Sequence, residues 1–358
     1  MKEFEIINYF QGVIGSLERL NNEISSENVT EYLKWKSEVI SGYLQYLQLS
    51  IYTHWEKGNK DAIRKLANEF PEVFESNEFI YNYYQDIFKN SYKSRVLKDK
   101  IVGYTEIYNW NDLLSDLMFS TNNLRLKDLS EFYKVIKFNL SDMFKIPFLK
   151  TISDSIIECL VEMRPDEFIE VGCSIVKANE EDTLNDIKDK LVQNYNQVFQ
   201  LIFEDLVNIR NSLAHNYVRK IGFDERSFNL MSKMIELLIS VFKILNLNLN
   251  FIIAKKANKI VQLNDVSIVR SFKDEKVIFE FDKLKLPNNI DVRDVFVIQK
   301  SISNVVAMRL SVSGDRCEDT NNKNIFSRAY SAISSENISD IKLNRGDENK
   351  FCFYTLKR

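Results

Sequence analysis

The sequence predicts a mainly α-helical protein, built of helical bundles, with a small β-rich domain at its C-terminal end. The 358 residues include only 9 Gly and 4 Pro, too few for the many tight turns of an all-β protein or for a glycine-rich nucleotide fold. Apolar residues recur at three- or four-residue steps before position 259, whereas β-branched and aromatic residues alternate or cluster after it. This length fits two or three domains, and we place them at 1–150, 151–258 and 259–358.

The region 1–150 is predicted to be helical and aromatic. Its second helix is expected to start near Asn28 or Thr30 and to end at Gly58, since glycine commonly follows the last periodic residue of a helix. The residues expected on its core face are Leu33, Val39, Ile40, Tyr43, Leu44, Leu47 and Ile51.

The segment 81–100 places aromatic rings beside cations. We expect Lys89, Tyr92, Lys93 and Arg95 to bind RNA, because rings stack on bases and cations neutralise phosphates. The same pattern also fits an amphipathic helix that packs its rings and leaves its basic face in solvent. The sequence leaves both interpretations open.

The region 151–258 is predicted to form a helical bundle. A helix over 152–163 should end before Pro165, because the residue before proline avoids helical geometry. A cap at Asn179 should begin one long helix with an unbroken apolar face up to Leu213, and Asp224 should cap another helix. Two long antiparallel helices joined by a short turn are typical of a bundle. The expected core of the last helix comprises Phe228, Met231, Ile235, Leu238, Phe242 and Leu245.

The region 259–358 is predicted to be a small β-rich domain. Five segments alternate or cluster β-branched and aromatic residues between polar breaks such as PNN and NRGDEN. These segments read VQLNDVSIVRSF, EKVIFEFDKL, VRDVFVIQKS, VVAMRLSVSG and KFCFYTLKR.

One short segment, VNIRNSLAHNY over 207–217, combines residues suited to RNA cleavage. Histidine side chains titrate near neutrality, so His215 is suited to proton transfer, while arginine stays charged, so Arg210 presents a planar cationic fork to phosphate oxygens. RNA supplies its own nucleophile, the 2′-OH, so no metal is needed. Asn211 lies four residues before His215 and therefore shares its helix face, where it is placed to orient the imidazole or contact ribose.

Composition limits the other classes of function. The chain holds only 2 His and 4 Cys, without a CxxC pattern, so a multi-histidine metal site and a disulfide framework are not expected. We expect no metal and no cofactor. A net charge of −3 excludes a histone-like attraction to nucleic acid but leaves room for a local basic groove. No cationic leader and no run of about 18 apolar residues is seen, which favours a cytoplasmic protein without a membrane partner.

The string RNSLAHNY resembles the signature of the HEPN superfamily, whose members are all-helical bundles with a ribonuclease site formed by an Arg, four to six intervening residues and a His. The resemblance covers about 151–258. It implies that Arg210 and His215 are catalytic, that Asn211 is the polar neighbour of that arginine, and that cleavage leaves 2′,3′-cyclic phosphate and 5′-hydroxyl ends. It also implies a homodimer in which two copies of the motif form one composite active site.

The expected function is therefore a metal-independent endoribonuclease acting on single-stranded RNA, as a toxin or anti-phage abortive-infection effector. In such an enzyme, the region 1–150 is expected to have a regulatory or RNA-selecting role. Tyr217 resembles the tyrosine that a partner antitoxin adenylylates in a subset of HEPN toxins, which implies a modification site and an antitoxin or regulatory partner. Simpler alternatives exist. His215 suits the negative end of a helix dipole, Arg210 can pair with Glu204 or Asp205 of a neighbouring protomer, and Tyr217 can serve packing. The bundle can also be a non-catalytic module binding RNA, a nucleotide or a protein, or a scaffold in a defence complex.

Overall fold

The computed structural model describes residues 3–25, 32–76, 129–130, 133–134, 136–163, 181–214, 225–271, 276–282, 284–286, 290–302, 305–313, 325–332 and 343–357. The described elements form two compact units, which we call the helical unit and the sheet unit. Each unit draws on separated stretches of the chain.

Six of the described helices lie wholly or partly in the helical unit. They are α1 (Glu3–Ser25), α2 (Tyr32–Glu69) as far as Arg64, α9 (Pro147–Met163) from Leu149, α11 (Leu184–Gln193), α12 (Tyr195–Ala214) and α13 (Glu225–Lys256) as far as Phe242. The last turn of α9 ends before Pro165, as predicted, and α13 begins directly after Asp224, where a helix was expected.

Helix α2 does not end at Gly58, which corrects the prediction from sequence. It continues to Glu69, and Gly58 is buried within it. A glycine inside a helix costs only about 1 kcal/mol relative to alanine. Burial of Ile63 and Leu66 beyond this point, together with the Lys60–Glu56 ion pair at 2.7 Å, offsets that cost.

The single long helix predicted after Asn179 is two helices, α11 and α12. Thr183 caps α11, because its hydroxyl accepts from the Asp186 N–H and the Asp186 carboxylate accepts from the Thr183 N–H. This reciprocal pair fixes the start of α11. Asn194 then leaves helical geometry, with φ −139° and ψ 80°. An apolar repeat can continue across such a break, so periodicity alone did not show it.

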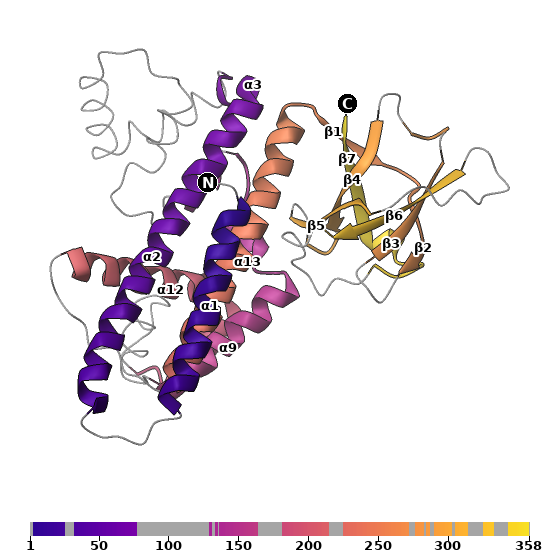
Figure 1. The fold of residues 1–358 in the computed structure, drawn as a ribbon. Coiled ribbons are helices and arrows are strands. Elements are labelled where there is room, and N and C mark those ends of the chain that lie inside the picture. The colour runs from indigo at the N-terminus through magenta and orange to yellow at the C-terminus, as the bar shows by residue number, and fades with distance from the viewer. Residues whose placement is uncertain are drawn as a thin grey trace, which may run out of the picture. The chain divides into compact units, whose positions relative to one another are not determined.

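The sheet unit combines short helices with a seven-stranded antiparallel sheet (Figure 1). Its helical parts are the end of α2 from Lys65, α3 (Pro71–Phe74), α8 (Leu140–Met143) and α13 from Lys243. Its strands are β1 (Ile260–Leu263), β2 (Ser267–Ser271), β3 (Lys276–Asp282), β4 (Ile290–Gln299), β5 (Val306–Val312), β6 (Ile325–Ala332) and β7 (Phe351–Lys357). Their order in the sheet is β1-β7-β4-β5-β6-β3-β2.

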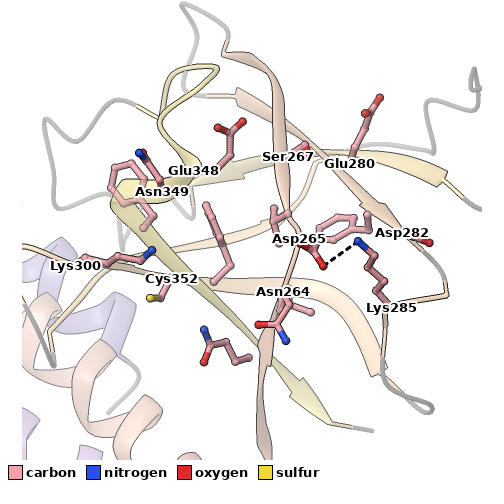
Figure 2. A pocket seen from close by; sticks show the side chains of 16 residues that line it. Asn264, Asp265, Ser267, Glu280, Asp282, Lys285, Lys300, Glu348, Asn349 and Cys352 are labelled. Carbon is pink, nitrogen blue, oxygen red and sulfur yellow. Dashed lines mark ion pairs between the residues drawn. The ribbon is translucent and has the colours of Figure 1, made fainter.

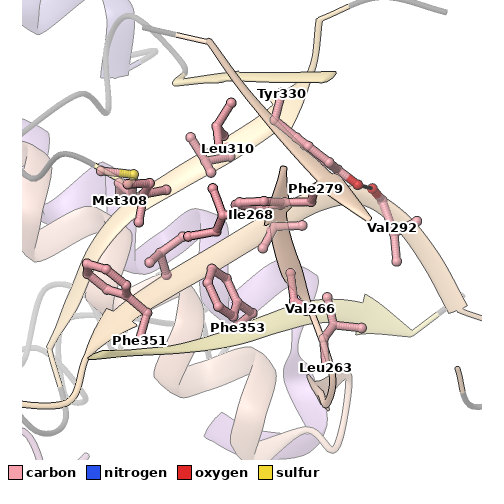
Figure 3. Packing of buried hydrophobic residues seen from close by; sticks show 14 of the residues in the cluster. Leu263, Val266, Ile268, Phe279, Val292, Met308, Leu310, Tyr330, Phe351 and Phe353 are labelled. Carbon is pink, nitrogen blue, oxygen red and sulfur yellow. Dashed lines mark hydrogen bonds between the residues drawn. The ribbon is translucent and has the colours of Figure 1, made fainter. Parts of the chain in front are cut away.

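The sheet curls so that distant strands share one core (Figure 3). Three strands separate β3 from β7 in the sheet, yet the rings of Phe279 and Phe353 lie 5.2 Å apart. Tyr330 packs on Phe279 at 5.2 Å, and its hydroxyl donates to the Val292 carbonyl at 2.6 Å. The concave face of the sheet is thus filled by its own side chains.

The predicted fold class, mainly α with helical bundles, is wrong. The seven-stranded sheet is a major part of the protein, and Figure 1 shows α12 running across the direction of α2 rather than alongside it. The β-rich C-terminal region fits the prediction, although β6 was missed and the first predicted segment divides into β1 and β2. Strand β6 (IFSRAYSA) has too weak an alternation to stand out.

One stretch of α13, Asn229–Lys256, is long and apolar enough to span a membrane by length and composition. No such stretch was expected, because the sequence contains no continuous run of about 18 apolar residues. Its most apolar window is 83 % buried within the protein, which is the behaviour of a core helix of a soluble protein.

Helix α13 is joined to the sheet by a buried asparagine. Asn248 is fully buried; its side-chain oxygen accepts from the Val306 N–H at 2.7 Å, and its side-chain amide donates to the Val306 carbonyl at 3.2 Å. Among the described residues, β6 pairs with β5 from Leu310 onward. The Asn248 side chain supplies hydrogen-bond partners for both backbone groups of Val306.

We expect Asn248→Ala to destabilise the protein by roughly 2–4 kcal/mol, because it leaves a buried N–H and a buried carbonyl of Val306 without partners. Asn250→Ala is the matched control: Asn250 is less buried, and its amide donates to the Asn246 carbonyl of the same helix. Urea unfolding of both variants tests this. Equal, small losses would contradict a structural role for the Asn248–Val306 pair.

Candidate functional site

Helix α12 is held in the helical unit by a cluster of aromatic side chains. Trp55 of α2 is fully buried, with its ring 5.9 Å from Phe199, 5.7 Å from Phe203 and 6.0 Å from Phe242. Residues four apart, such as Phe199 and Phe203, lie on one helix face. This packing fixes the rotation of α12 about its axis and therefore the direction of the residues at its end.

Arg210 and Asn211 lie in the final turns of α12, beyond the aromatic cluster. Both are half-buried, and the Arg210 guanidinium donates from Nη1 to the Asn211 Oδ1 at 3.2 Å. Within the described part of the chain, no carboxylate forms an ion pair with Arg210. The contact uses one of the five N–H donors of the guanidinium, so the charged fork retains donors for a phosphate.

The structure brings together two of the three predicted catalytic residues. The described part of α12 ends at Ala214, and His215, which follows directly in sequence, lies outside the described residues. Tyr217, the predicted modification site, also lies outside them. So do the predicted RNA-binding residues Lys89, Tyr92, Lys93 and Arg95.

His54, the other histidine, has a packing role on α2. Its ring stacks on Tyr9 of α1, with centroids 3.7 Å apart and planes 5° from parallel. Its Nδ1 lies 2.7 Å from the Ser50 carbonyl, and since a carbonyl only accepts, Nδ1 must be the donor. The Tyr9 hydroxyl donates to Ser50 Oγ, and burial raises the Tyr9 pKa despite that bond. These contacts join α1 to α2.

The sheet unit contains an acidic cavity, defined by the carboxylates of Asp265, Glu280, Asp282 and Glu348 (Figure 2). Its volume is about 780 Å³. Lys285 forms an ion pair with Asp265 at 3.1 Å. Among the described residues, no group of three His, Cys, Asp or Glu side chains is arranged to hold a metal ion.

Glu348 in this cavity links the two ends of the curled sheet. Its carboxylate accepts from the Ile268 N–H of β2 at 2.8 Å, while Glu348 itself precedes β7. Partial burial acts to raise the pKa of Glu348, but bonds from the backbone N–H groups of Glu348, Ile268 and Gly346 outweigh it and lower the pKa. The acidic cavity is thus a structural junction.

Trp55→Ala should destabilise the helical unit by roughly 3–5 kcal/mol, because it leaves a cavity among three aromatic rings. Trp55→Phe should cost much less, since the Trp55 Nε1 is buried without a partner among the described residues. Tyr46→Ala, at a side chain 64 % exposed on the same helix, is the control. Chemical denaturation measures all three, and similar losses for Trp55→Ala and Tyr46→Ala would contradict this assignment.

The depressed pKa of Glu348 predicts a pH-dependent contribution to stability. The ionised carboxylate stabilises the folded state above the pKa that glutamate has in the unfolded chain, and this stabilisation is lost as pH falls through the folded-state value. Glu348→Gln should therefore lower the melting temperature by a few degrees at neutral pH and by much less in acid. The exposed Glu75→Gln should show no such difference; an equal penalty for Glu348→Gln at both pH values would contradict the role.

No family model, curated protein or solved structure matches this chain. The resemblance to the HEPN superfamily is confined to one short segment, RNSLAHNY.

Proposed function

We propose that this protein is a metal-independent endoribonuclease of the HEPN type that cleaves single-stranded RNA. The observation that carries the proposal is the contact between Arg210 and Asn211 at the end of α12, directly before His215 in sequence. A half-buried guanidinium that pairs with no described carboxylate, five residues before a histidine in sequence, is a combination suited to RNA cleavage.

Each of the three residues has a distinct task. His215 transfers a proton from the 2′-OH or to the leaving 5′-oxygen. Arg210 stabilises the negative charge that develops on the phosphorane-like transition state. Asn211 accepts from the guanidinium through its Oδ1, and its task is to orient the imidazole or contact the ribose.

The biological setting follows from the same proposal. A second copy of the chain supplies a second Arg210–His215 pair, so the active enzyme is a homodimer with a composite site. Such a site is inactive until it is assembled, which suits a cytoplasmic toxin or abortive-infection effector held in check by an antitoxin or regulatory partner. Tyr217 lies close enough in sequence to His215 to serve as the point of modification.

Arg210→Ala and His215→Ala should each lower cleavage of labelled single-stranded RNA in EDTA by about 100-fold or more, since each removes a charge or proton transfer in the transition state. Arg210→Lys keeps the charge but loses the planar fork, and should rescue only part of the activity. Arg19→Ala, at an exposed arginine of α1, is the control.

Two further measurements separate catalysis from its alternatives. RNA carrying a single 2′-deoxy position should resist cleavage at that position only. Melting temperatures of the Arg210 and His215 variants should match the parent protein, because these side chains add little to the core. RNA binding without cleavage by the parent protein would replace this proposal with a non-catalytic binding module, and a large loss of stability would assign His215 a structural role.

A further inference from the structure

The sheet unit contains a second cavity, of about 620 Å³, whose chemistry is opposite to that of the acidic cavity. We call it the lysine cavity. Four lysines, Lys137, Lys255, Lys256 and Lys300, line it together with the aromatic residues Phe251 and Tyr354. Its volume falls in the range of ordinary small-molecule sites.

The lysines come from three places in the fold. Lys255 and Lys256 form the last turn of α13, and Lys300 follows the end of β4. Lys137 sits in a left-handed turn, with φ 64°. There the Lys137 N–H donates to the Lys134 carbonyl and the Phe138 N–H to the Tyr133 carbonyl, the paired bonds of a Schellman motif. Glycine is the usual residue at that position, and this chain places a cation there.

Three of these four lysines have no carboxylate partner among the described residues. No carboxylate is among the described residues that line the lysine cavity, and within the described chain Lys255, Lys256 and Lys300 form no ion pair. All four lysines are exposed. Elsewhere in the same unit Lys285 and Lys350 pair with Asp265 and Asp347 at 3.1 and 2.7 Å. Gathered cations without carboxylates repel one another, and a bound anion relieves that repulsion.

The wall of the lysine cavity is aromatic. The rings of Phe251 and Tyr354 meet edge to face at 5.3 Å, and Phe251 also packs on Phe296 at 5.5 Å. Phe251 is buried, whereas Tyr354 is half-exposed. Burial raises the pKa of Tyr354, with a smaller contribution from Cys352, so its phenol stays neutral and keeps its O–H donor. A planar ring and a hydroxyl donor beside four cations suit a ligand with both a base and a phosphate.

We propose that the lysine cavity binds a nucleotide unit, with Tyr354 against the base and the lysines around the phosphate. The unit comes either from a free nucleotide or from one residue of a single-stranded RNA. This inference goes beyond the proposed nuclease activity, because it uses none of Arg210, Asn211 and His215. A nucleotide bound here would act as a ligand of the sheet unit and not as the cleaved bond.

The test measures binding in the full-length chain carrying Arg210→Ala, so that no probe is consumed. A fluorescent single-stranded RNA of about ten nucleotides, a length that suits one nucleic-acid module, reports on the strand by anisotropy. AMP and ATP report on the free nucleotide by calorimetry. Lys255→Ala/Lys256→Ala should weaken whichever of these binds by roughly tenfold or more. For RNA, the slope of log affinity against log salt should fall by about 1.4, the loss of two phosphate contacts.

Two more variants separate binding from folding. Lys137→Gly should weaken binding without lowering the melting temperature, because glycine accepts the left-handed turn more readily than lysine. Tyr354→Leu should weaken nucleotide binding while leaving any affinity for inorganic phosphate unchanged. Lys285→Ala removes one charge from the acidic cavity of the same unit, and should leave binding unchanged.

Binding of AMP that the cavity variants weaken would identify a free nucleotide as the ligand, and binding of RNA alone would identify a strand. The proposal is overturned if neither probe binds, if Lys285→Ala weakens binding as much as the cavity variants, or if inorganic phosphate competes as well as AMP. It is also overturned if the protein binds phosphatidylserine vesicles through these lysines and nucleotides do not displace them. Because cleavage is measured separately, failure here leaves the nuclease proposal intact, and the reverse also holds.

Discussion

The sheet unit depends on the pairing of the Asn248 side chain with the backbone of Val306. Backbone donors and acceptors in an apolar interior are costly when they are left unpaired. Here an amide side chain from α13 provides both partners at 2.7 and 3.2 Å. Phe251, three residues after Asn248 in α13, packs on Phe296 and Tyr354. One hydrogen-bonded residue and one aromatic residue therefore determine where the end of α13 lies on the sheet.

The position of α13 on the sheet affects where charged side chains gather in the sheet unit. The chain as a whole is slightly acidic, with 48 basic and 51 acidic residues, yet the sheet unit separates the two signs. Carboxylates gather where β1, β2 and β3 approach η1 (Glu348–Lys350), while lysines gather at the end of α13. Lys300 and Cys352 line both cavities. A net charge near zero thus conceals a separation of carboxylates and lysines between two cavities of one unit.

The sequence pattern predicted which segments form helices and strands better than it predicted where those helices and strands end or how they pack. The alternation of residue types located most of the strands. Pro165 correctly marked the end of α9, and Asp224 correctly marked the start of α13. Gly58 was expected to end α2 but is carried within it, since burial of the following turns outweighs a small backbone penalty. Asn194 breaks a helix that its apolar repeat suggested was continuous. The mainly α fold class failed because seven short strands, each weak alone, combine into one large sheet.

The sequence by itself determined the chemistry that this protein can offer: two histidines, an Arg–Asn pair before one of them, and strand-forming segments after residue 259. It placed Arg210 and Asn211 together, because neighbours on a helix stay neighbours in any fold. Tertiary structure alone decided that Phe279 meets Phe353 across three strands, and that Lys137 and Lys300 join Lys255 and Lys256 around one cavity. Contacts between residues so far apart in the chain depend on sheet curvature and helix packing, which no local pattern of residues encodes.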